Sequence, residues 1–438
     1  MTLRKRPDYQ SRESFMATAT VISRARGNGL TPRVAAGQEP SPRRLRLLLY
    51  SLLLGSSAFQ TAIVPLLPDY AHRFGLSSFN QGMLLSATAF STLAVSVPAG
   101  NLADRFGAKR LTLASAYLMA LGVGMEALTP SFSGLLLARL VFGLGYGVVW
   151  AAGLAWLGST SPDGSRLGGT VAASGVGGIL GPVLAGTLGQ SFGLGMPFWI
   201  GASAFVAFGV MLGTIGAPAR AIRFAGGDDG RGRLGEMIHN KSIVVATAAI
   251  VAAGIAWSVA YLLVPEQLQS AGISSGTIGV FISAAAVVYV IGSTTMTSFG
   301  PRVIRAKVIL AAVLALGLIF ALGLLGATPV ALVSLLCGSA VARAVLWTVA
   351  YPLAARGAEE RGLGLGVVMG TLQAVWAGTA VVSPLLAGAA ASSAGPGAAY
   401  LLAMLAMLGL VAVTVCLIRR RQLSLRARLV LERVGVAV

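Results

Sequence analysis

The sequence predicts an all-α integral membrane protein in which twelve transmembrane helices form two pseudo-symmetric six-helix halves. Two observations point to a membrane protein. Of the 438 residues, 55% are hydrophobic and only 11% are charged, whereas about a quarter of the residues in a soluble protein are charged. Apolar stretches of about 20 residues recur along the chain, and each is long enough to cross a bilayer as a helix.

The third observation is the distribution of positive charge. All but three of the 33 lysine and arginine residues fall in segments that we assign to one side of the membrane; the exceptions are Arg73, Arg139 and Arg343. This asymmetry follows the positive-inside rule, so we expect a multi-pass plasma-membrane protein with both termini in the cytoplasm. The net charge of +19 then reflects a lipid bilayer as partner, and nucleic acid is not expected as one.

The polar segments divide the chain into five parts. We expect a disordered basic cytoplasmic tail at 1–42, a first half at 43–216, a central cytoplasmic loop at 217–240, a second half at 241–418 and a basic tail at 419–438. The first half is predicted to hold helices at 45–68, 79–98, 111–128 and 133–157, a fifth that carries residues 168–186, and a sixth that ends near 216. The second half is predicted to hold helices near 242–264, 277–298, 305–326, 330–351, 363–388 and 397–418.

A charged, glycine-bracketed turn is expected after the second helix. Gly100 lets the helix end approach a neighbour closely, and Gly107 permits a tight turn. Asp104 can lie against the positive N-terminal end of a nearby helix. Arg105 and Lys109 hold the turn on the cytoplasmic side.

Two further motifs lie on later helices. The fourth helix carries Arg139, Gly143 and Gly145 in an R-x-x-x-G-x-G pattern, and an arginine inside a membrane helix is expected to face the protein interior. The fifth helix carries small residues at a spacing that forms a smooth face for close helix packing, with a proline that favours a kink: Gly168, Gly177, Gly181, Pro182 and Gly186.

These three motifs, in this order, resemble those of the major facilitator superfamily. The resemblance covers about residues 45–420 and implies the major facilitator fold. It also implies that the turn around Asp104 is a cytoplasmic latch between the halves. The fifth-helix pattern departs from the family's antiporter motif only at Ala185, and that motif is found mainly in exporters that exchange substrate for protons. Close packing alone gives the same pattern, so both interpretations stay open.

The resemblance further implies a substrate site between the halves, lined by helices 1, 4, 7 and 10. The candidate substrate-binding residues there and on the eleventh helix are Gln60, Tyr146, Trp257, Arg343, Trp347 and Gln373. For the aromatic residues the alternative is packing or an interfacial position. Arg343 has no carboxylate nearby in the sequence. It either binds a polar or anionic substrate, pairs with a carboxylate of another helix, or stays hydrated in the cytoplasmic funnel.

Proton coupling needs a carboxylate that changes its protonation state, and few are available. Only Asp69, Glu126 and Glu266 lie outside the predicted cytoplasmic segments, all near outer helix ends. Glu126 is expected to pair with Arg139, and Asp69 and Glu266 are expected to be counterparts in the two halves. The alternative is that all three acids are solvated residues at the mouth. The first helix lacks the midplane acid that several proton-coupled drug exporters of the family carry, which weakens the case for coupling.

The sequence does not predict an enzyme. It contains no phosphate-binding glycine loop with a lysine and no compact Ser/His/Asp set, and its two cysteines and two histidines are far apart. We therefore expect no metal and no cofactor, with a proton gradient as the energy source. The prediction is a monomeric secondary transporter that exports a small organic molecule or drug by alternating access, with protons as the coupling ion. The alternative is an uptake symporter or uniporter for a polar or anionic metabolite.

Overall fold

The computed structural model is helical throughout the part of the chain that it describes. It describes residues 42–159, 168–215, 235, 237–326, 328–363 and 365–433, and the side chains of a few helical residues and of 417–433 lie outside the description. The predicted tail at 1–42 and the central loop fall almost entirely outside the described residues. Of Gly100, Asp104 and Gly168 only the helical backbone is described.

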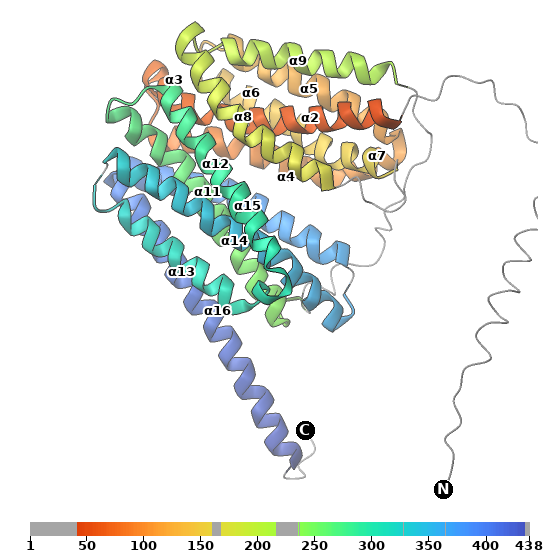
Figure 1. The fold of residues 1–438 in the computed structure, drawn as a ribbon, viewed down its shortest axis with the longest axis vertical. Helices are drawn as coiled ribbons and strands as arrows, with labels where there is room; N and C mark the ends of the chain where they lie inside the picture. Colours follow the sequence, from red (N-terminus) through yellow and green to blue (C-terminus); the bar gives the residue numbers. More distant parts are fainter. Residues whose placement is uncertain are drawn as a thin grey trace, which may run out of the picture. The chain divides into compact units, whose positions relative to one another are not determined.

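The first half, shown in Figure 1, consists of ten segments that form six membrane-crossing units. They are α2 (Pro42–Ala62), the 3-10 helix η1 (Val64–Leu66), α3 (Leu67–Phe74), α4 (Ser78–Phe106), α5 (Ala108–Leu128), α6 (Phe132–Val148), the π-helical turn η2 (Val149–Gly153), α7 (Leu154–Ser159), α8 (Gly168–Phe192) and α9 (Met196–Gly213).

The second half contains six long helices and one short connecting turn. They are α11 (Lys241–Ser270), α12 (Ser275–Ser298), the 3-10 turn η4 (Gly300–Val303), α13 (Ala306–Leu322), α14 (Pro329–Arg361), α15 (Leu365–Ala394) and α16 (Pro396–Arg433). Ten helices among the described residues are long and apolar enough to cross a membrane, and α13 is a shorter apolar helix of 17 residues. Together with α4, of 29 residues, they account for the twelve predicted helices.

The first helix is interrupted where the sequence predicted a continuous span. The α-helix ends at Ala62, a 3-10 turn covers Val64–Leu66, and a new helix continues to Phe74. Pro65 and Pro68 explain the break, because proline has no N–H to donate and clashes with the preceding turn. The left-handed Gly75 then ends α3, so Asp69 lies within α3 rather than at the last turn of the first helix.

The predicted turn after the second helix is mostly helical. Helix α4 continues through residues 100–106 and stops at Gly107, whose φ of 88° is unfavourable for other residues. Helix α5 begins at the next residue. The prediction of a loop from Gly100 onward was therefore wrong, since charged residues alone do not end a helix and Gly107 is the first residue that does.

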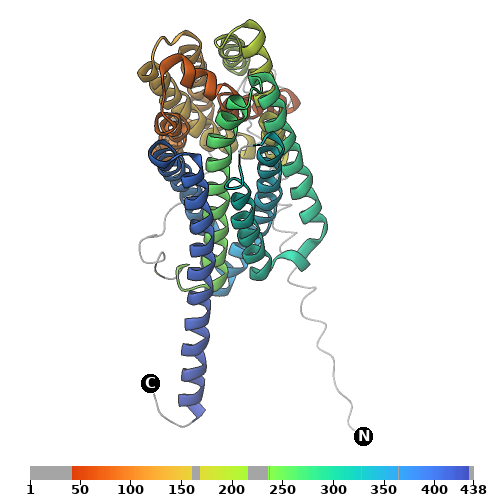
Figure 2. The same ribbon diagram turned by 90° about the vertical axis from the view of Figure 1, so that its left-hand side faces the viewer.

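Four later helices also extend beyond their predicted ends. Helix α11 continues past Pro265 to Ser270, α14 continues to Arg361, and α15 continues to Ala394. Helix α16 continues to Arg433, well beyond the neighbouring helix ends (Figure 2). The predictions placed the ends where apolar residues stop, but a helix needs a breaker such as Gly362 in the left-handed conformation.

The two halves pack against each other through two helix pairs. Helix α4 of the first half contacts α15 of the second, and α8 of the first half contacts α12 of the second. Helices α4 and α12 begin, and α8 and α15 end, at the side that the charge pattern predicts to face outward. We call this side the outer end.

Candidate functional site

A buried ion pair lies between α5 and α6. Arg139 Nη1 is 3.4 Å from Glu126 Oε1, and each side chain is only 1% exposed. The pairing expected from the sequence is therefore present. It is the only ion pair that joins two described residues. Charged side chains in a membrane-spanning region are costly and are usually paired with one another.

Arg139 also connects this pair to the first helix. Its guanidinium donates to the backbone carbonyls of Phe59 at 3.3 Å and Gln60 at 3.4 Å, and it lies 5.4 Å from the ring centre of Phe142. Glu126 is less well satisfied, since its Oε2 is buried and has no hydrogen-bond partner among the described residues. A proton can therefore bind Oε2 without displacing Arg139 from Oε1.

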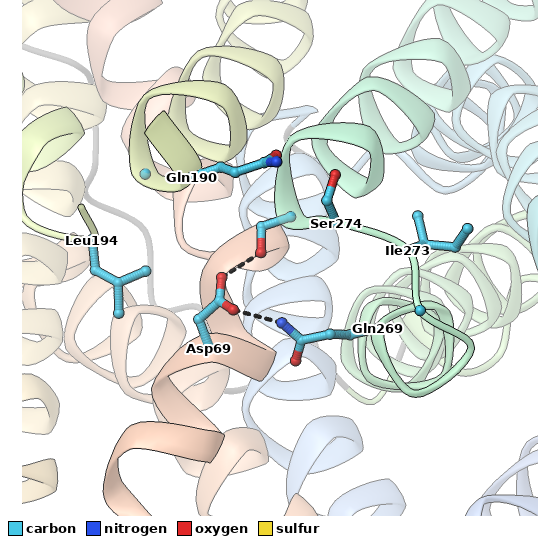
Figure 3. Close-up of a pocket in the computed structure, with 9 residues that line it drawn as sticks. Asp69, Gln190, Leu194, Gln269, Ile273 and Ser274 are labelled. Atoms are coloured by element: carbon cyan, nitrogen blue, oxygen red, sulfur yellow. Dashed lines mark hydrogen bonds between the residues drawn. The ribbon is translucent and has the colours of Figure 1, made fainter. Parts of the chain in front are cut away.

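Two other acidic residues join the halves at the outer end. Asp69 accepts a hydrogen bond from Gln269 Nε2 at 2.5 Å and another from the hydroxyl of Ser275, beside a cavity of about 500 Å³ (Figure 3). Glu266 accepts from Ser78 Oγ at 3.2 Å, beside a second cavity of about 400 Å³. Each acid thus binds the first serine of a helix in the opposite half.

Glycine contacts around these acids are duplicated. A Cβ atom on Gly186 would overlap the carbonyl oxygen of Ser275, and one on Gly388 would overlap that of Ser78. In the same way, Gly279 lies against the carbonyl of Pro182. The matching contact in the other helix pair is Gly82 against Pro384.

Hydrogen bonds between the halves follow the same duplication. Ser86 Oγ donates to Val381 O at 2.7 Å, and Ser283 Oγ donates to Ile179 O at 2.6 Å. The backbone N–H of Phe79 donates to Ser392 Oγ, and that of Gly276 donates to Gln190 Oε1. We use the name outer seal for these contacts between the halves. They comprise the hydrogen bonds of Asp69 and Glu266, the contacts of α4 with α15, and the contacts of α8 with α12.

The glycines of the fifth-helix motif have a direct packing role. Gly177 lies against the backbone carbonyl of Leu54 and Gly181 against that of Ala58, both on α2. Gly186 packs instead on α12 in the other half. Helix α8 therefore needs small residues on both faces, and close packing accounts for these motif positions.

The predicted latch residues are only partly described. Lys109 Nζ donates to the carbonyls of Gly213 at 3.3 Å and Ile215 at 2.5 Å, at the end of α9 in its own half. This contact suits a cation, because the C-terminal end of a helix is negative. Arg105 is exposed, and no contact described for Arg105 or Lys109 reaches the second half.

Arg343 lies among aromatic rings on the second half. Its guanidinium carbon is 5.5 Å from the ring centre of Tyr261 and 5.8 Å from that of Tyr289. One turn along α14, Trp347 stacks on Tyr351 at 5.4 Å. No described carboxylate lies within 4.0 Å of Arg343, so the predicted alternative of an ion pair with another helix is not observed.

Four of the six predicted substrate-binding residues come together in this region. Trp257 stacks on Tyr261 at 5.2 Å, Trp347 meets Trp376 edge to face at 6.2 Å, and Gln373 accepts from the hydroxyl of Tyr351 at 2.8 Å. The other two, Gln60 and Tyr146, belong to the first half, where Tyr146 lies 6.1 Å from Trp150. None of the six lines either outer cavity.

The sequence did not predict two sets of contacts. The hydrogen-bond partners of the acids in the outer seal are Ser78, Gln269 and Ser275. The second ring beside Arg343 is that of Tyr289. The signal for the two serines is present, since Pro-Asp69 and Pro-Glu266 are each followed, at the same distance, by Gly-Leu-Ser-Ser78 and Gly-Ile-Ser-Ser275. Tyr289 has no comparable signal, because its position beside Arg343 depends on how α12 packs.

Comparisons with known proteins agree with this architecture. The family model described as Major Facilitator Superfamily matches residues 49–252, a little under half of the chain. The solved structure of the nucleoside transporter NupG has a TM-score of 0.68 at 14% identity and covers 86% of this chain and 98% of that one. An inward-facing bacterial homologue of the lysosomal transporter Spinster has a TM-score of 0.64 at 16% identity, and covers 87% and 96%.

This chain has the fold of the major facilitator superfamily, and residues 49–252 match that superfamily's model. Members of this superfamily are transporters rather than enzymes. Its relatives include the quinolone resistance protein NorA of Staphylococcus aureus, 31% identical over 150 residues, which are 33% of this chain and 38% of NorA. The MFS-type transporter YuxJ of Bacillus subtilis is 30% identical over 173 residues, 38% of this chain and 43% of YuxJ. These matches span about two fifths of each relative.

Proposed function

We propose that this protein is a secondary active transporter that exports a small organic molecule in exchange for protons. The buried Glu126–Arg139 pair carries the proposal, since it places a titratable carboxylate inside the membrane-spanning region. Protonation of the free Oε2 of Glu126 weakens its attraction for Arg139, which also holds the backbone of α2 through two carbonyls. A proton is thereby linked to the position of a helix expected to line the substrate path.

Two further observations support export as the direction. The fifth-helix motif is of the type found in proton-exchanging exporters, and the partial sequence match to NorA is to a quinolone resistance protein. The closure of the outer end by the outer seal fits one step of alternating access, in which a substrate enters from the cytoplasm. We further propose that the protein lies in the plasma membrane as a monomer with cytoplasmic termini, and that it needs no cofactor.

Direction is tested by the accumulation of fluorescent cations and labelled organic anions in cells that express the protein. Export predicts lower accumulation in expressing cells and loss of this difference when a protonophore collapses the proton gradient. Higher accumulation of an anion would instead support the alternative, uptake of a polar or anionic metabolite, for which the unpaired Arg343 is the specific observation.

Proton coupling is tested by Glu126→Gln in proteoliposomes. We expect this variant to lose uphill transport driven by a pH gradient, while exchange of labelled for unlabelled substrate persists, because exchange needs no net proton movement. The exposed Glu359 provides a matched control, and Glu359→Gln should keep both activities. Uphill transport by Glu126→Gln at the wild-type level would contradict the assignment of the carboxylate.

A further inference from the structure

We propose that Arg343 and the rings around it form the binding site for an aromatic organic anion, such as an aryl carboxylate. This inference rests on the proposed function and names its substrate class. The site comprises Arg343 with Tyr261, Tyr289, Trp347 and Trp376, and we call it the arginine–aromatic site.

The two arginines of the membrane-spanning region differ in what satisfies them. Arg139 has a carboxylate and two backbone carbonyls as acceptors. Arg343 is 7% exposed and makes no hydrogen bond to a described residue, and its described contacts are those with the rings of Tyr261 and Tyr289. Its Nε is buried without a partner, as is the Nε of Arg139. A buried charge is normally paired, so an anion that comes and goes accounts for an arginine left in this state.

The carboxylates that the structure describes in the second half either accept a hydrogen bond from another residue or lie far from Arg343. Glu266 accepts a hydrogen bond from Ser78. Glu360 accepts one from Asn240 at 2.9 Å. Glu359 is exposed near the end of α14, 16 residues from Arg343 and thus about 24 Å along the helix axis. The arginine–aromatic site therefore carries an uncompensated positive charge, which attracts anions and repels cations.

The rings around Arg343 define the rest of the ligand. Tyr261 and Tyr289 flank the guanidinium at 5.5 and 5.8 Å, which stabilises its charge only weakly. Trp347 lies one turn from Arg343 on the same face of α14 and meets Trp376 edge to face. Aromatic side chains favour stacking with planar apolar ligands, so a ring bearing the anionic group fits better than a small inorganic anion.

Exposed side chains beside the arginine–aromatic site indicate that this site is in contact with water. Gln373 is exposed on α15, and its side chain accepts from Tyr351, which stacks on Trp347. Tyr289, Trp347 and Trp376 are each partly exposed. An exposed amide within a membrane-spanning helix is unfavourable beside lipid, so the surface around Gln373 is an aqueous one from which a ligand can reach Arg343.

The guanidinium explains why a carboxylate is the preferred anion. Its planar fork can donate two parallel hydrogen bonds to the two oxygens of a carboxylate, which a lysine cannot do. The unpartnered Nε of Arg343 is one of the donors available for this arrangement.

An anionic substrate has a consequence for the driving force. Export of one monovalent anion in exchange for one proton moves two positive charge equivalents inward per cycle. The same exchange with a monovalent cation moves none. The membrane potential alone should therefore drive export of the anion, and it should have no effect on export of a monovalent cation.

Binding to the purified full chain tests the proposal. We would measure quenching of tryptophan fluorescence by three probes that share one ring system: 1-naphthoate, 1-naphthylmethanol and 1-naphthylmethylammonium. The expected order is tightest for the anion, by at least tenfold over the neutral probe. In Arg343→Gln this preference should vanish while the neutral probe binds as before, and Arg343→Lys should keep part of it. Arg356, exposed on the same helix, supplies the control variant Arg356→Gln, which should bind like wild type.

Two results would overturn the proposal. One is a wild-type protein that binds the anion no better than the neutral probe, which is decisive even if Arg343→Gln does not fold. The other is a full anion preference in a folded Arg343→Gln variant. Retained binding of the neutral probe reports folding in each variant.

Transport measurements separate this inference from the proposed function. In proteoliposomes with a potassium-diffusion potential and no pH gradient, naphthoate export should follow the potential. Proton-coupled export restricted to the neutral or cationic probe would refute the arginine–aromatic site and leave the proposed function standing. Arg343-dependent binding of naphthoate without any coupled export would refute the proposed function and leave the anion site standing.

Discussion

Glu126 and Arg139 form one ion pair, but they depend on it unequally. Glu126 uses one oxygen in the contact and leaves the other without a partner. Arg139 donates to three acceptors and lies over the ring of Phe142. Loss of the arginine therefore removes a junction between α2, α5 and α6, whereas loss of the carboxylate removes one contact of that junction.

This asymmetry predicts different stabilities for two single variants. Arg139→Gln leaves a buried carboxylate and two carbonyls without their donor, so we expect a loss of about 3–5 kcal/mol in unfolding free energy. Glu126→Gln should lose only about 1–3 kcal/mol, because Arg139 keeps its backbone acceptors and the amide resembles a protonated carboxyl group. Thermal unfolding of the purified variants compares the two, and a larger loss in Glu126→Gln would contradict this description of the pair.

The sequence predicted this pair but not the surroundings of Arg343. Glu126 and Arg139 lie 13 residues apart on consecutive helices, so both fall near the same end and a contact follows from chain connectivity. The rings that flank Arg343 come from α11 and α12, which are far apart from α14 in sequence. Which of their faces meets α14 depends on helix rotation, and these helices are apolar on nearly every side.

At the scale of elements, the position of α8 depends on the absence of side chains. Gly181 lies so close to Ala58 O that an added Cβ would overlap the backbone of α2, whereas Gly178, on the same helix, has no neighbour within 4 Å of such an atom. The glycine spacing predicted close packing of this helix. It did not reveal that one face packs on α2 and another on α12, because a spacing pattern does not identify the partner.

Two substitutions on α8 test this assignment. Gly181→Ala should reduce the yield of folded protein and lower its melting temperature, because neither backbone can move away without separating the helices. Gly178→Ala is the control with the same chemical change, and it should be neutral or slightly stabilising since alanine favours the helix by up to about 1 kcal/mol. Equal melting temperatures for the two variants would show that α8 and α2 are not packed this closely.

On the scale of the whole molecule, the outer seal is a duplicated structure. The hydrogen bonds and glycine contacts described between α4 and α15 have counterparts between α8 and α12, including the serine hydroxyls that donate to Val381 O and Ile179 O. Residues 181–186 (Gly-Pro-Val-Leu-Ala-Gly) and 383–388 (Ser-Pro-Leu-Leu-Ala-Gly) are similar in sequence, which indicates duplicated halves. That these repeats meet across the halves could not be predicted, because sequence repeats show which residues correspond and not which residues touch.

The duplication makes a prediction about how the halves separate. The amides of Phe79 and Gly276 lie in the first turn of α4 and α12, where N–H groups have no acceptor within the helix. Their acceptors are Ser392 and Gln190 of the opposite half, so slow hydrogen exchange at these amides reports closure of the outer seal. Ser275→Ala removes a hydrogen bond to Asp69, and each 1.4 kcal/mol lost from the closed state raises the open population about tenfold.

We therefore expect Ser275→Ala to accelerate exchange of both amides together, although Phe79 belongs to the other helix pair. Ser78→Ala should have a similar but smaller effect, because Glu266 is 3.2 Å from its donor, and the double variant should exchange fastest. Ser298→Ala removes a bond within α12 at the opposite end and should leave both amides unchanged. Acceleration at Gly276 alone would mean that the two helix pairs open independently, and the outer seal would then not act as one unit.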